Sequence, residues 1–415
     1  MTLDTTRDGP ITGTGTASVS EPTSAELVAR AAALVPDLIA AQAETEALTR
    51  TPQHLVDRMR GADLYRVLVP RRYGGLEKDL AAFTDIVTEL ARGCPSTAWG
   101  YCLAARHVVQ VATLFPRSAQ DAILSADFLA ASVAAPTGTL REVENGWVVE
   151  GTFQFASGSV YSTHYLGQAF PIAEPGGKPI GPPAVFIAPR EAWTQLDDWG
   201  WTLGLRGSGS NGVRFDGAVI PHDHVLLDTF FLDLNVSEGT AGSALYENPL
   251  YSGRTVGPIS LDVAALMTGM ALGALDEYEK LLETKRTVRP PITTRADNGY
   301  YLRWAGKAAA QLDAARALIR SGCEKHAQAC RDQQAGVAEF TARKDLETVV
   351  MGREAVLLAW DAMSNKLFRS AGTTATGQAE RMSRIWRDMS TAWTHIYNSQ
   401  GEMYDEDLGR ARLGR

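Results

Sequence analysis

The order of local patterns along the chain limits its fold more than any other feature. From residue 25 to about 127 apolar residues recur three and four positions apart, which is typical of amphipathic helices. From about 128 to 233 the sequence changes to short runs rich in Val, Phe, Trp and Thr between glycine turns, which predict strands. Four long helical patterns then follow. Because helices and strands are segregated by region, we expect an α+β protein and not an alternating Rossmann fold.

This order divides the 415 residues into four predicted parts. We expect a disordered tail over 1–24, a helical domain over 25–127, a middle β domain over 128–233, built as a barrel or sandwich, and a four-helix bundle within 234–415. The tail is rich in Thr, Ser and Gly and cannot bury enough apolar surface to order itself.

Composition excludes several classes of partner. Forty-eight acidic residues against 40 basic ones give a net charge of -8, without a Lys/Arg block that could follow a nucleic-acid backbone. No apolar run approaches the roughly 18 residues typical of a membrane span. The four cysteines have no metal or disulfide spacing, and the N-terminus lacks a signal-peptide pattern. We therefore expect a cytoplasmic protein with neither a metal site nor a membrane partner.

Two motifs suggest ligand sites that their context does not support. GSGSNG at 207–212 looks like a phosphate loop, but a predicted strand follows it where a dinucleotide fingerprint needs a helix. The HDH triplet at 222–224 lacks any further ligand at zinc spacing. We interpret both as turns.

The three-part order, together with LVPRRYGG, WTLGLRGSGSNGVRFDGAVIP and RIWRDM, resembles the acyl-CoA dehydrogenase superfamily over residues 25–404. Within it, GCPSTAW, SVAAPTGTLREVENGWVVEGTFQFASG and the late histidine of RIWRDMSTAWTH are similar to the oxygenase branch. That branch comprises two-component hydroxylases that use reduced flavin, such as steroid-ring phenol hydroxylases, p-hydroxyphenylacetate hydroxylase, dibenzothiophene monooxygenase and aminosugar N-oxygenases.

The dehydrogenase and oxygenase branches need different residues. A dehydrogenase requires a carboxylate base against its substrate. The resemblance places that glutamate at Asn398, or at about Ile259 in some relatives, and neither residue can accept the proton. The arginine-Phe-Gly motif that helps dehydrogenases to hold FAD is also not legible in KRTVRPPITT. The sequence thus favours an oxygenase whose flavin arrives reduced and leaves.

The resemblance implies the first flavin contacts in the β domain. Ser157 of FASG falls where the family hydrogen-bonds flavin N5, and Phe155 then lies near the ring edge. Backbone groups of Val133, Ala134 and Ala135 face the pyrimidine side. The alternative for FASG is a plain turn at the end of a strand.

His395 is the main candidate for proton handling. It follows Asp388 by seven residues, two turns along one predicted helix, and corresponds to the histidine that related hydroxylases place over the flavin. His107 is a second candidate, with packing against the β domain as the alternative. Trp99, Leu103 and His107 share one face of a helix that we expect Ser96 to cap. Trp99 and Tyr101 are candidates for lining the substrate pocket or, alternatively, for the core.

Further carried-over contacts lie elsewhere in the sequence. Arg206 in LGLRGSGS borders the flavin or substrate entrance in the family, or else braces its loop. Ser370, Gly372 and Thr373 lie where relatives bring backbone amides to the flavin phosphate, often from a neighbouring subunit, and Arg286 is a candidate charge partner.

The resemblance implies a monooxygenase that takes FMN or FAD already reduced by a separate NAD(P)H-dependent flavin reductase. Such an enzyme adds O2 as a flavin C4a-hydroperoxide and transfers one oxygen atom to a small substrate. We expect a phenolic or polycyclic aromatic substrate and a homotetramer. Three alternatives stay open: N-oxygenation of an amine or aminosugar, an acyl-CoA or nitroalkane-type dehydrogenase, and a helical interaction protein that has lost its flavin.

Overall fold

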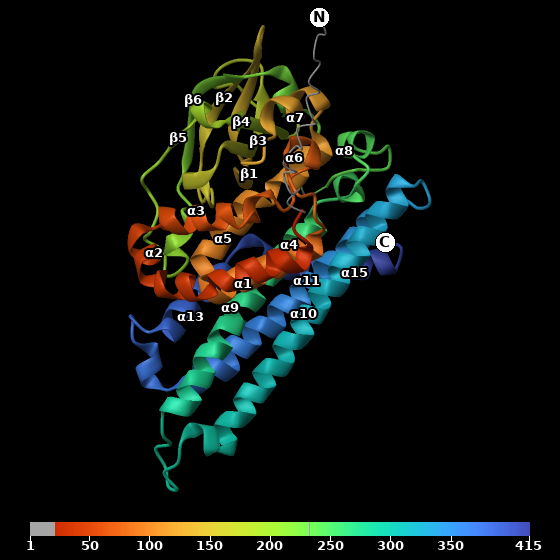
Figure 1. Ribbon diagram of the computed structural model, residues 1–415. Helices are drawn as coiled ribbons and strands as arrows, with labels where there is room; N and C mark the ends of the chain where they lie inside the picture. The colour runs from red at the N-terminus through yellow and green to blue at the C-terminus, as the bar shows by residue number, and fades with distance from the viewer. Residues whose placement is uncertain (1–20, 232) are drawn as a thin grey trace, which may run out of the picture.

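The computed structural model describes residues 21–231 and 233–415 as one sheet domain above a set of long helices (Figure 1). Most of the tail predicted over 1–24 lies outside these described residues. A helical N-terminal region, a mixed sheet and a helical C-terminal region follow one another along the chain, which confirms the predicted α+β order.

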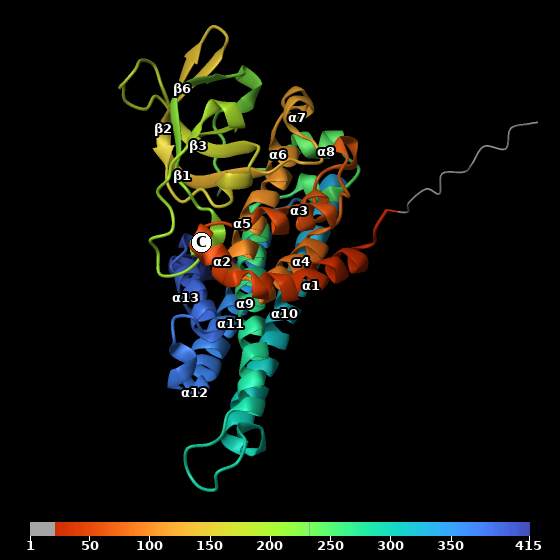
Figure 2. The same ribbon diagram turned by 60° about the vertical axis from the view of Figure 1, so that its left-hand side comes forward.

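The N-terminal region consists of seven helices that pack beside the sheet and over the long helices (Figure 2). They are α1 (Ser24–Ala40), α2 (Gln42–Leu48), α3 (Gln53–Gly61), α4 (Leu80–Gly93), α5 (Pro95–Ala105), α6 (His107–Leu114) and α7 (Arg117–Ile123). A capping box fixes the start of the first helix, since the Thr23 hydroxyl accepts from the Glu26 amide and the Glu26 carboxylate accepts from Thr23.

The helix predicted to run from Ser96 to about residue 114 differs from that expectation in two ways. Its cap position lies two residues earlier, at Cys94, with Pro95 in the first turn, so Ser96 does not cap it. It also breaks at Arg106, whose guanidinium pairs with the buried Asp262 at 2.6 Å. His107 therefore opens α6 and does not continue the face of α5 that carries Trp99.

The middle region is one seven-stranded sheet in the order β5-β6-β2-β1-β3-β4-β7. Its strands are β1 (Ala130–Val143), β2 (Gly146–Phe153), β3 (His164–Ile172), β4 (Ala184–Pro189), β5 (Thr194–Gln195), β6 (Val213–Ile220) and β7 (Val225–Leu226). β1 and β3 run parallel, and the other neighbours are antiparallel. Four aromatic rings with centroids 5.1–5.8 Å apart form the centre of its core: Phe153, Tyr165, Phe186 and Phe215.

The C-terminal region contains the predicted long helices. Its helical segments are α8 (Ala241–Leu245), α9 (Val256–Thr284), α10 (Gly299–Gln334), α11 (Ala342–Asp361), a π-helical turn (Ala362–Phe368), α12 (Arg369–Ala371), α13 (Arg381–Trp393), α14 (Ile396–Ser399) and α15 (Gly401–Arg412). α9 lies at the centre of the bundle, against α4, α10 and α11.

α9 also shows that one expectation about apolar runs was too strict. It is long and apolar enough to cross a membrane by composition, with a mean hydropathy of 1.5 over its best 18-residue window. However, 94% of that window is buried inside the protein. Its apolar residues therefore face the other helices of the bundle, as in the core helix of a folded domain.

Candidate active site

The FASG turn at the end of β2 is held directly against α5. Gly158 has a φ of 74°, and a Cβ there would lie 2.7 Å from the Gly100 carbonyl oxygen. Only glycine allows this backbone contact. The close approach buries Ser157 and fixes its hydroxyl next to the face of α5 that carries Trp99.

Trp99 joins two of the predicted functional residues. Its Nε1 donates a hydrogen bond to Ser157 Oγ at 3.1 Å. Its ring meets the His395 ring edge-on, with 5.2 Å between the centroids. The sequence placed Ser157, Trp99 and His395 in three different regions, and the structure brings them into one cluster, which we call the Trp99 cluster.

Two serines that the sequence analysis did not select complete the surroundings of Ser157. Ser210 Oγ lies 2.8 Å from Ser157 Oγ, and Ser208 Oγ lies 2.6 Å from Ser210 Oγ. A hydroxyl has one proton and two acceptor positions. If Ser210 donates to Ser157, both acceptor positions of Ser157 are filled by Ser210 and Trp99, and its proton is free for a ligand. The alternation of serine and glycine in GSGSNG was the available signal for these residues.

His395 lies in an extended segment between two helices, so the prediction that it shares one helix with Asp388 was wrong. α13 ends at Trp393, and His395 has φ -60° and ψ 145°. Asn398 supports this end of the helix, because its Nδ2 donates at 2.8 Å to the Ala392 carbonyl oxygen, which also accepts from the His395 backbone amide at 3.1 Å. The amide at the predicted position of the dehydrogenase base thus has a structural role.

The His395 ring is electrically neutral and incompletely bonded. Desolvation lowers its pKa to about 4, so the imidazole is uncharged at neutral pH. Its Nδ1 is buried without a hydrogen-bond partner among the described residues. A buried polar atom of this kind is costly unless a ligand or water satisfies it.

An exposed aromatic group lies beside the cluster. Phe155, two residues before Ser157, is 55% exposed and has the left-handed φ of 65°, which is strained for a bulky side chain. Its ring contacts Trp199 and Trp201, with centroids 6.1 and 6.4 Å away, and Trp201 is 74% exposed. Apolar rings held open to solvent in this way offer a surface for a flat ligand.

The backbone of β1 near Val133 has open hydrogen-bonding positions. Pairing with β3 shifts register between Val133 and Gly138, and pairing with β2 begins only at Thr139. Ala135, which is exposed, therefore pairs with neither strand, while the Ala134 carbonyl accepts from Gln168. Of the three predicted pyrimidine contacts, Ala135 thus lies in an unpaired part of the strand, whereas Val133 pairs with Gly167 of β3.

The second candidate histidine, His107, is in a different environment. It is buried, and its Nδ1 lies 2.7 Å from the Ala130 carbonyl oxygen at the start of β1. Desolvation, followed by the nearby Arg106 charge, lowers its pKa to about 3. This geometry fits packing against the β domain, the alternative that the sequence left open. A catalytic role for His107 stays a prediction.

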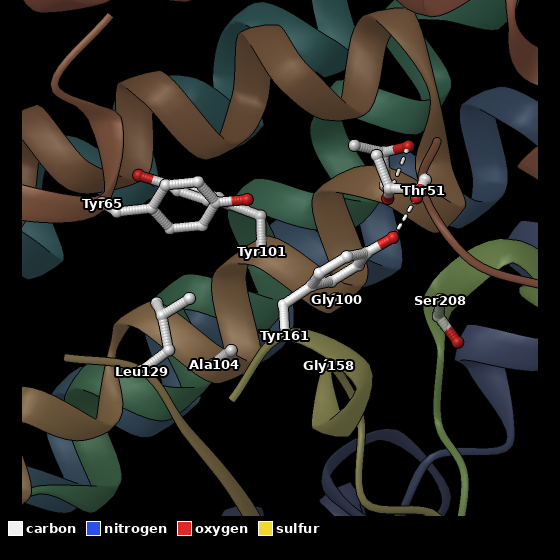
Figure 3. A pocket seen from close by; sticks show the side chains of 10 residues that line it. Thr51, Tyr65, Gly100, Tyr101, Ala104, Leu129, Gly158, Tyr161 and Ser208 are labelled. Atoms are coloured by element: carbon white, nitrogen blue, oxygen red, sulfur yellow. Dashed lines mark hydrogen bonds between the residues drawn. The ribbon is translucent and has the colours of Figure 1, made fainter. Parts of the chain in front are cut away.

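Tyr101 lines a small cavity that Trp99 does not line (Figure 3). Two residues along a helix turn by about 200°, so the two aromatic side chains point in different directions. The cavity has about 10 Å³ of room for the centre of a water molecule, which is enough for one water and too small for an aromatic ring. Its other walls include Tyr65, Tyr161 and Gly158. A substrate contact by Tyr101 stays a prediction.

Arg206 braces its own loop. Its Nε donates to the Gly200 carbonyl oxygen at 2.6 Å, and its Nη1 lies 3.8 Å from the Glu46 carboxylate on α2. Glu46 also pairs with Arg384 and Arg387 of α13, at 2.8 and 2.9 Å. These contacts correspond to the alternative stated for Arg206, and they connect the loop to α13.

The predicted phosphate contacts lie on and just after α12, which carries Ser370 and lies below α5, the helix of Trp99, in Figure 2. Ser370 Oγ bonds Tyr278 Oη at 2.7 Å, and Gly372, with φ 96°, lies against Arg295. Thr373 begins the next short helical turn, and Arg286 donates to the Ile292 carbonyl oxygen at 3.0 Å.

Both motifs interpreted as turns are turns. The GSGSNG segment is followed by β6, and the HDH triplet forms a single 3-10 turn after that strand. Within the described residues 21–231 and 233–415, no group of three or more His, Cys, Asp or Glu side chains could hold a metal ion.

Curated relatives match nearly the whole chain. A pigment production hydroxylase of Rhodococcus sp. (strain ATCC 21145) is 28% identical over 402 residues, covering 95% of this chain and 96% of the relative. The flavin-dependent monooxygenase oxygenase subunit HsaA of Rhodococcus jostii is 27% identical, covering 90% and 94%. The oxygenase component of p-hydroxyphenylacetate 3-hydroxylase from Acinetobacter baumannii is also 27% identical, covering 91% and 86%.

Solved structures share the fold. The 3-HSA hydroxylase from Rhodococcus sp. RHA1 superimposes with a TM-score of 0.82 at 26% identity and covers 94% of this chain and 97% of its own. XiaF from Streptomyces sp., solved with FADH2 and glycerol, has a TM-score of 0.85 at 22% identity, covering 94% and 96%.

Two family descriptions match the two helical parts. "Acyl-CoA dehydrogenase, N-terminal domain" matches residues 21–148, and "Acyl-CoA dehydrogenase, C-terminal domain" matches residues 261–400. The matches occur in the order in which the structure arranges these regions around the middle sheet. The chain therefore belongs to the acyl-CoA dehydrogenase family, and the curated relatives that it resembles are monooxygenases and hydroxylases.

Proposed function

We propose that this protein is the oxygenase component of a two-component flavin-dependent monooxygenase that hydroxylates a small phenolic substrate. The observation that carries the proposal is the Trp99 cluster, in which Ser157 and a neutral His395 with a free Nδ1 meet on either side of one tryptophan. The full-length relatives at 27–28% identity, which include two oxygenase components, support the same activity.

The residues present fit a flavin ring. The Ser157 hydroxyl is positioned to hydrogen-bond a ring nitrogen, the open backbone near Ala135 can bond the polar pyrimidine edge, and Phe155 offers an exposed aromatic face. Reduced FMN or FAD, when bound, supplies the two electrons by which one oxygen atom of O2 enters the product and the other leaves as water.

His395 then has a defined task. A neutral imidazole with a free nitrogen can accept a hydrogen bond from a phenolic hydroxyl and draw its proton away. The oxygen becomes more electron-rich, and with it the aromatic carbon beside it, which is the atom to be oxygenated. Trp99 contacts both residues, the imidazole through its ring and Ser157 through Nε1.

Dehydrogenation by the same protein has less support. Asn398 donates to Ala392, and Ile259 is a buried apolar residue of α9, so neither family position provides a base. Asp388 is a carboxylate near the Trp99 cluster. Its two oxygens already accept from Leu205 N at 2.6 Å and Ser96 Oγ at 3.4 Å, so it is not placed as a substrate base.

The same proposal includes a partner and an assembly. Oxygenase components work with a separate reductase, which we infer to be an NAD(P)H-dependent flavin reductase. We also infer a cytoplasmic homotetramer, because Ser370, Gly372 and Thr373 are distant from the Trp99 cluster in one chain and would reach its flavin from a neighbouring subunit. The four cysteines, which are buried and unbridged, are compatible with a reducing compartment.

A flavin reoxidation experiment with labelled oxygen tests the function. Purified protein is mixed anaerobically with reduced FMN or FAD, 18O2 is admitted, and the return of oxidised-flavin absorbance is followed with a panel of phenols present. We expect slower reoxidation than for free flavin and one 18O atom in a hydroxylated product. Reoxidation at the rate seen with heat-denatured protein would refute the proposal, and label on the nitrogen of an amine panel would assign N-oxygenation instead.

A further inference from the structure

Asp388 lies where three parts of the active site meet. It is on α13 and is 5% exposed. One carboxylate oxygen accepts from the backbone N of Leu205, and the other accepts from Ser96 on α5. The first contact reaches the loop that carries Ser208 and Ser210, and the second reaches the helix that carries Trp99.

The contact with the loop is close and specific. A Cβ on Gly204 would lie 2.1 Å from the Arg387 carbonyl oxygen, so the loop backbone rests directly on α13. Gly204 N also donates to Thr391 Oγ1 at 2.8 Å. Leu205 has a φ of 54°, a left-handed conformation that a leucine adopts only when its surroundings impose it. The Asp388 carboxylate, as acceptor for the Leu205 amide, is one of the groups that impose it.

From Leu205 a continuous path of bonds leads to the flavin-facing serine. The Ser208 amide donates to the Leu205 carbonyl oxygen at 3.0 Å, and the Ser208, Ser210 and Ser157 hydroxyls follow at 2.6 and 2.8 Å. The Gly158 amide donates to the Ser208 carbonyl oxygen at 3.3 Å. A shift of the loop would therefore move the hydroxyl that Trp99 also holds.

We infer that Asp388 is a positioning residue whose anionic carboxylate fixes the serine loop and α5 relative to His395, so that Ser157, Trp99 and His395 stay assembled. This inference rests on the proposed function for its catalytic meaning, but the anchoring itself is a property of the chain alone. We call the bonds from Leu205 N and Ser96 Oγ to the Asp388 carboxylate the Asp388 anchor. Charge-assisted hydrogen bonds to a carboxylate are stronger than bonds to a neutral acid, so protonation of Asp388 weakens this anchor.

The charge of Asp388 depends on the groups around it. Glu46 of α2 faces it, Arg384 and Arg387 belong to its own helix, and the Cys94 thiol lies at the junction of α4 and α5. Desolvation raises the pKa of Asp388 to about 7, against the favourable bond from Leu205. The anion therefore forms as pH rises through about 7, and the anchor is expected to tighten over that range.

Hydrogen exchange of the full-length protein tests the anchor without any flavin. Asp388→Ala should speed amide exchange in 204–212, while the core of α9 and α10 keeps its protection. In the wild type, exchange in this segment, corrected for the intrinsic effect of pH, should slow as pH rises through about 7. Asp388→Asn has the shape of the neutral acid and should show faster exchange that does not respond to pH in this way.

Asp345→Asn is the matched control. Asp345 is also buried, accepts a backbone bond from Gly257 N at 2.9 Å and has a pKa raised by desolvation to about 6, but it lies on α11 outside the cluster. We expect this variant to leave exchange in 204–212 unchanged. The inference would be overturned if Asp388→Ala and Asp345→Asn lost protection equally in 204–212, or if Asp388→Ala kept wild-type protection there.

Reoxidation of reduced FMN by O2 then connects the anchor to function. We expect both Asp388 variants to reoxidise the flavin about tenfold faster than the wild type, because a site displaced by a fraction of an ångström protects its ligand poorly. A wild type that does not slow reoxidation refutes the proposed function, whereas the exchange data still decide the anchor. If Asp388→Ala and Asp388→Asn both change hydrogen exchange in 204–212 but reoxidise the flavin at the wild-type rate, Asp388 has no positioning role in the active site.

Discussion

The surroundings of His395 and the helical core around His107 contain the same kind of side chain in opposite states. His107 is buried, with its Nδ1 2.7 Å from the Ala130 carbonyl oxygen, next to the Arg106–Asp262 ion pair. His395 has an Nδ1 without a partner among the described residues, and its ring meets that of Trp99, which also bonds Ser157. Both rings are desolvated and neutral, so the pKa does not distinguish them. The unused hydrogen-bonding capacity of His395 Nδ1 distinguishes them.

His395→Ala should have the largest effect on activity and little effect on stability. Removing the proton acceptor from a phenol hydroxylase should lower kcat by about 10²- to 10⁴-fold. The free energy of unfolding should change by less than about 1 kcal/mol, because the ring makes no internal hydrogen bond through Nδ1. Product formation under single-turnover conditions and urea unfolding measure the two quantities. A variant with wild-type kcat would remove His395 from the mechanism.

His107→Leu should give the reverse result. The substitution leaves the Ala130 carbonyl oxygen without its partner and should cost about 1–3 kcal/mol of stability at pH 7. Hydroxylation by the folded fraction should stay near the wild-type rate. His107→Gln, which keeps an N–H for that carbonyl, is the control and should recover part of the lost stability. A large fall in kcat with unchanged stability would move the catalytic role to His107.

The pH dependence sharpens the His107 test. The pKa of His107 is about 3 in the folded protein against 6.5 in the unfolded chain, so below pH 6.5 the unfolded chain binds the proton and the fold does not. The stability advantage of the wild type over His107→Leu is therefore complete above pH 6.5 and falls by about 1.4 kcal/mol for each pH unit below it. Unfolding curves at pH 7.5, 6.5 and 5.5 measure this slope. An advantage that grows toward low pH would contradict a buried neutral imidazole.

The same contrast explains which parts of the site the sequence could predict. Local periodicity was enough to predict the order of helical and β regions. Resemblance proposed Ser157 and His395, which both contact Trp99 in the structure. His395 leaves its helix where the Asn398 side chain and the His395 amide both donate to the Ala392 carbonyl oxygen. The Asp388–Leu205 contact joins residues 183 positions apart. Such contacts leave no periodic signal, because they follow from how separately folded segments pack.

Trp99→Phe should have the smallest effect and tests whether the cluster acts as one unit. Phenylalanine keeps an aromatic ring against His395 but loses the Nε1 donor to Ser157, a bond of the size of about 1 kcal/mol. Ser157 is then still held by Ser210, so its hydroxyl can reorient instead of being lost.

We expect reduced flavin to bind to Trp99→Phe about two- to tenfold more weakly, with kcat changed less than the dissociation constant, because the bond orients a flavin contact and not the proton acceptor. Titration of the protein with reduced FMN under anaerobic conditions measures the first quantity and single-turnover hydroxylation the second. If Trp99→Phe lowered kcat as much as His395→Ala while flavin binding stayed unchanged, Trp99 would act through the imidazole, and the division between a flavin-holding side and a proton-handling side of the cluster would be wrong.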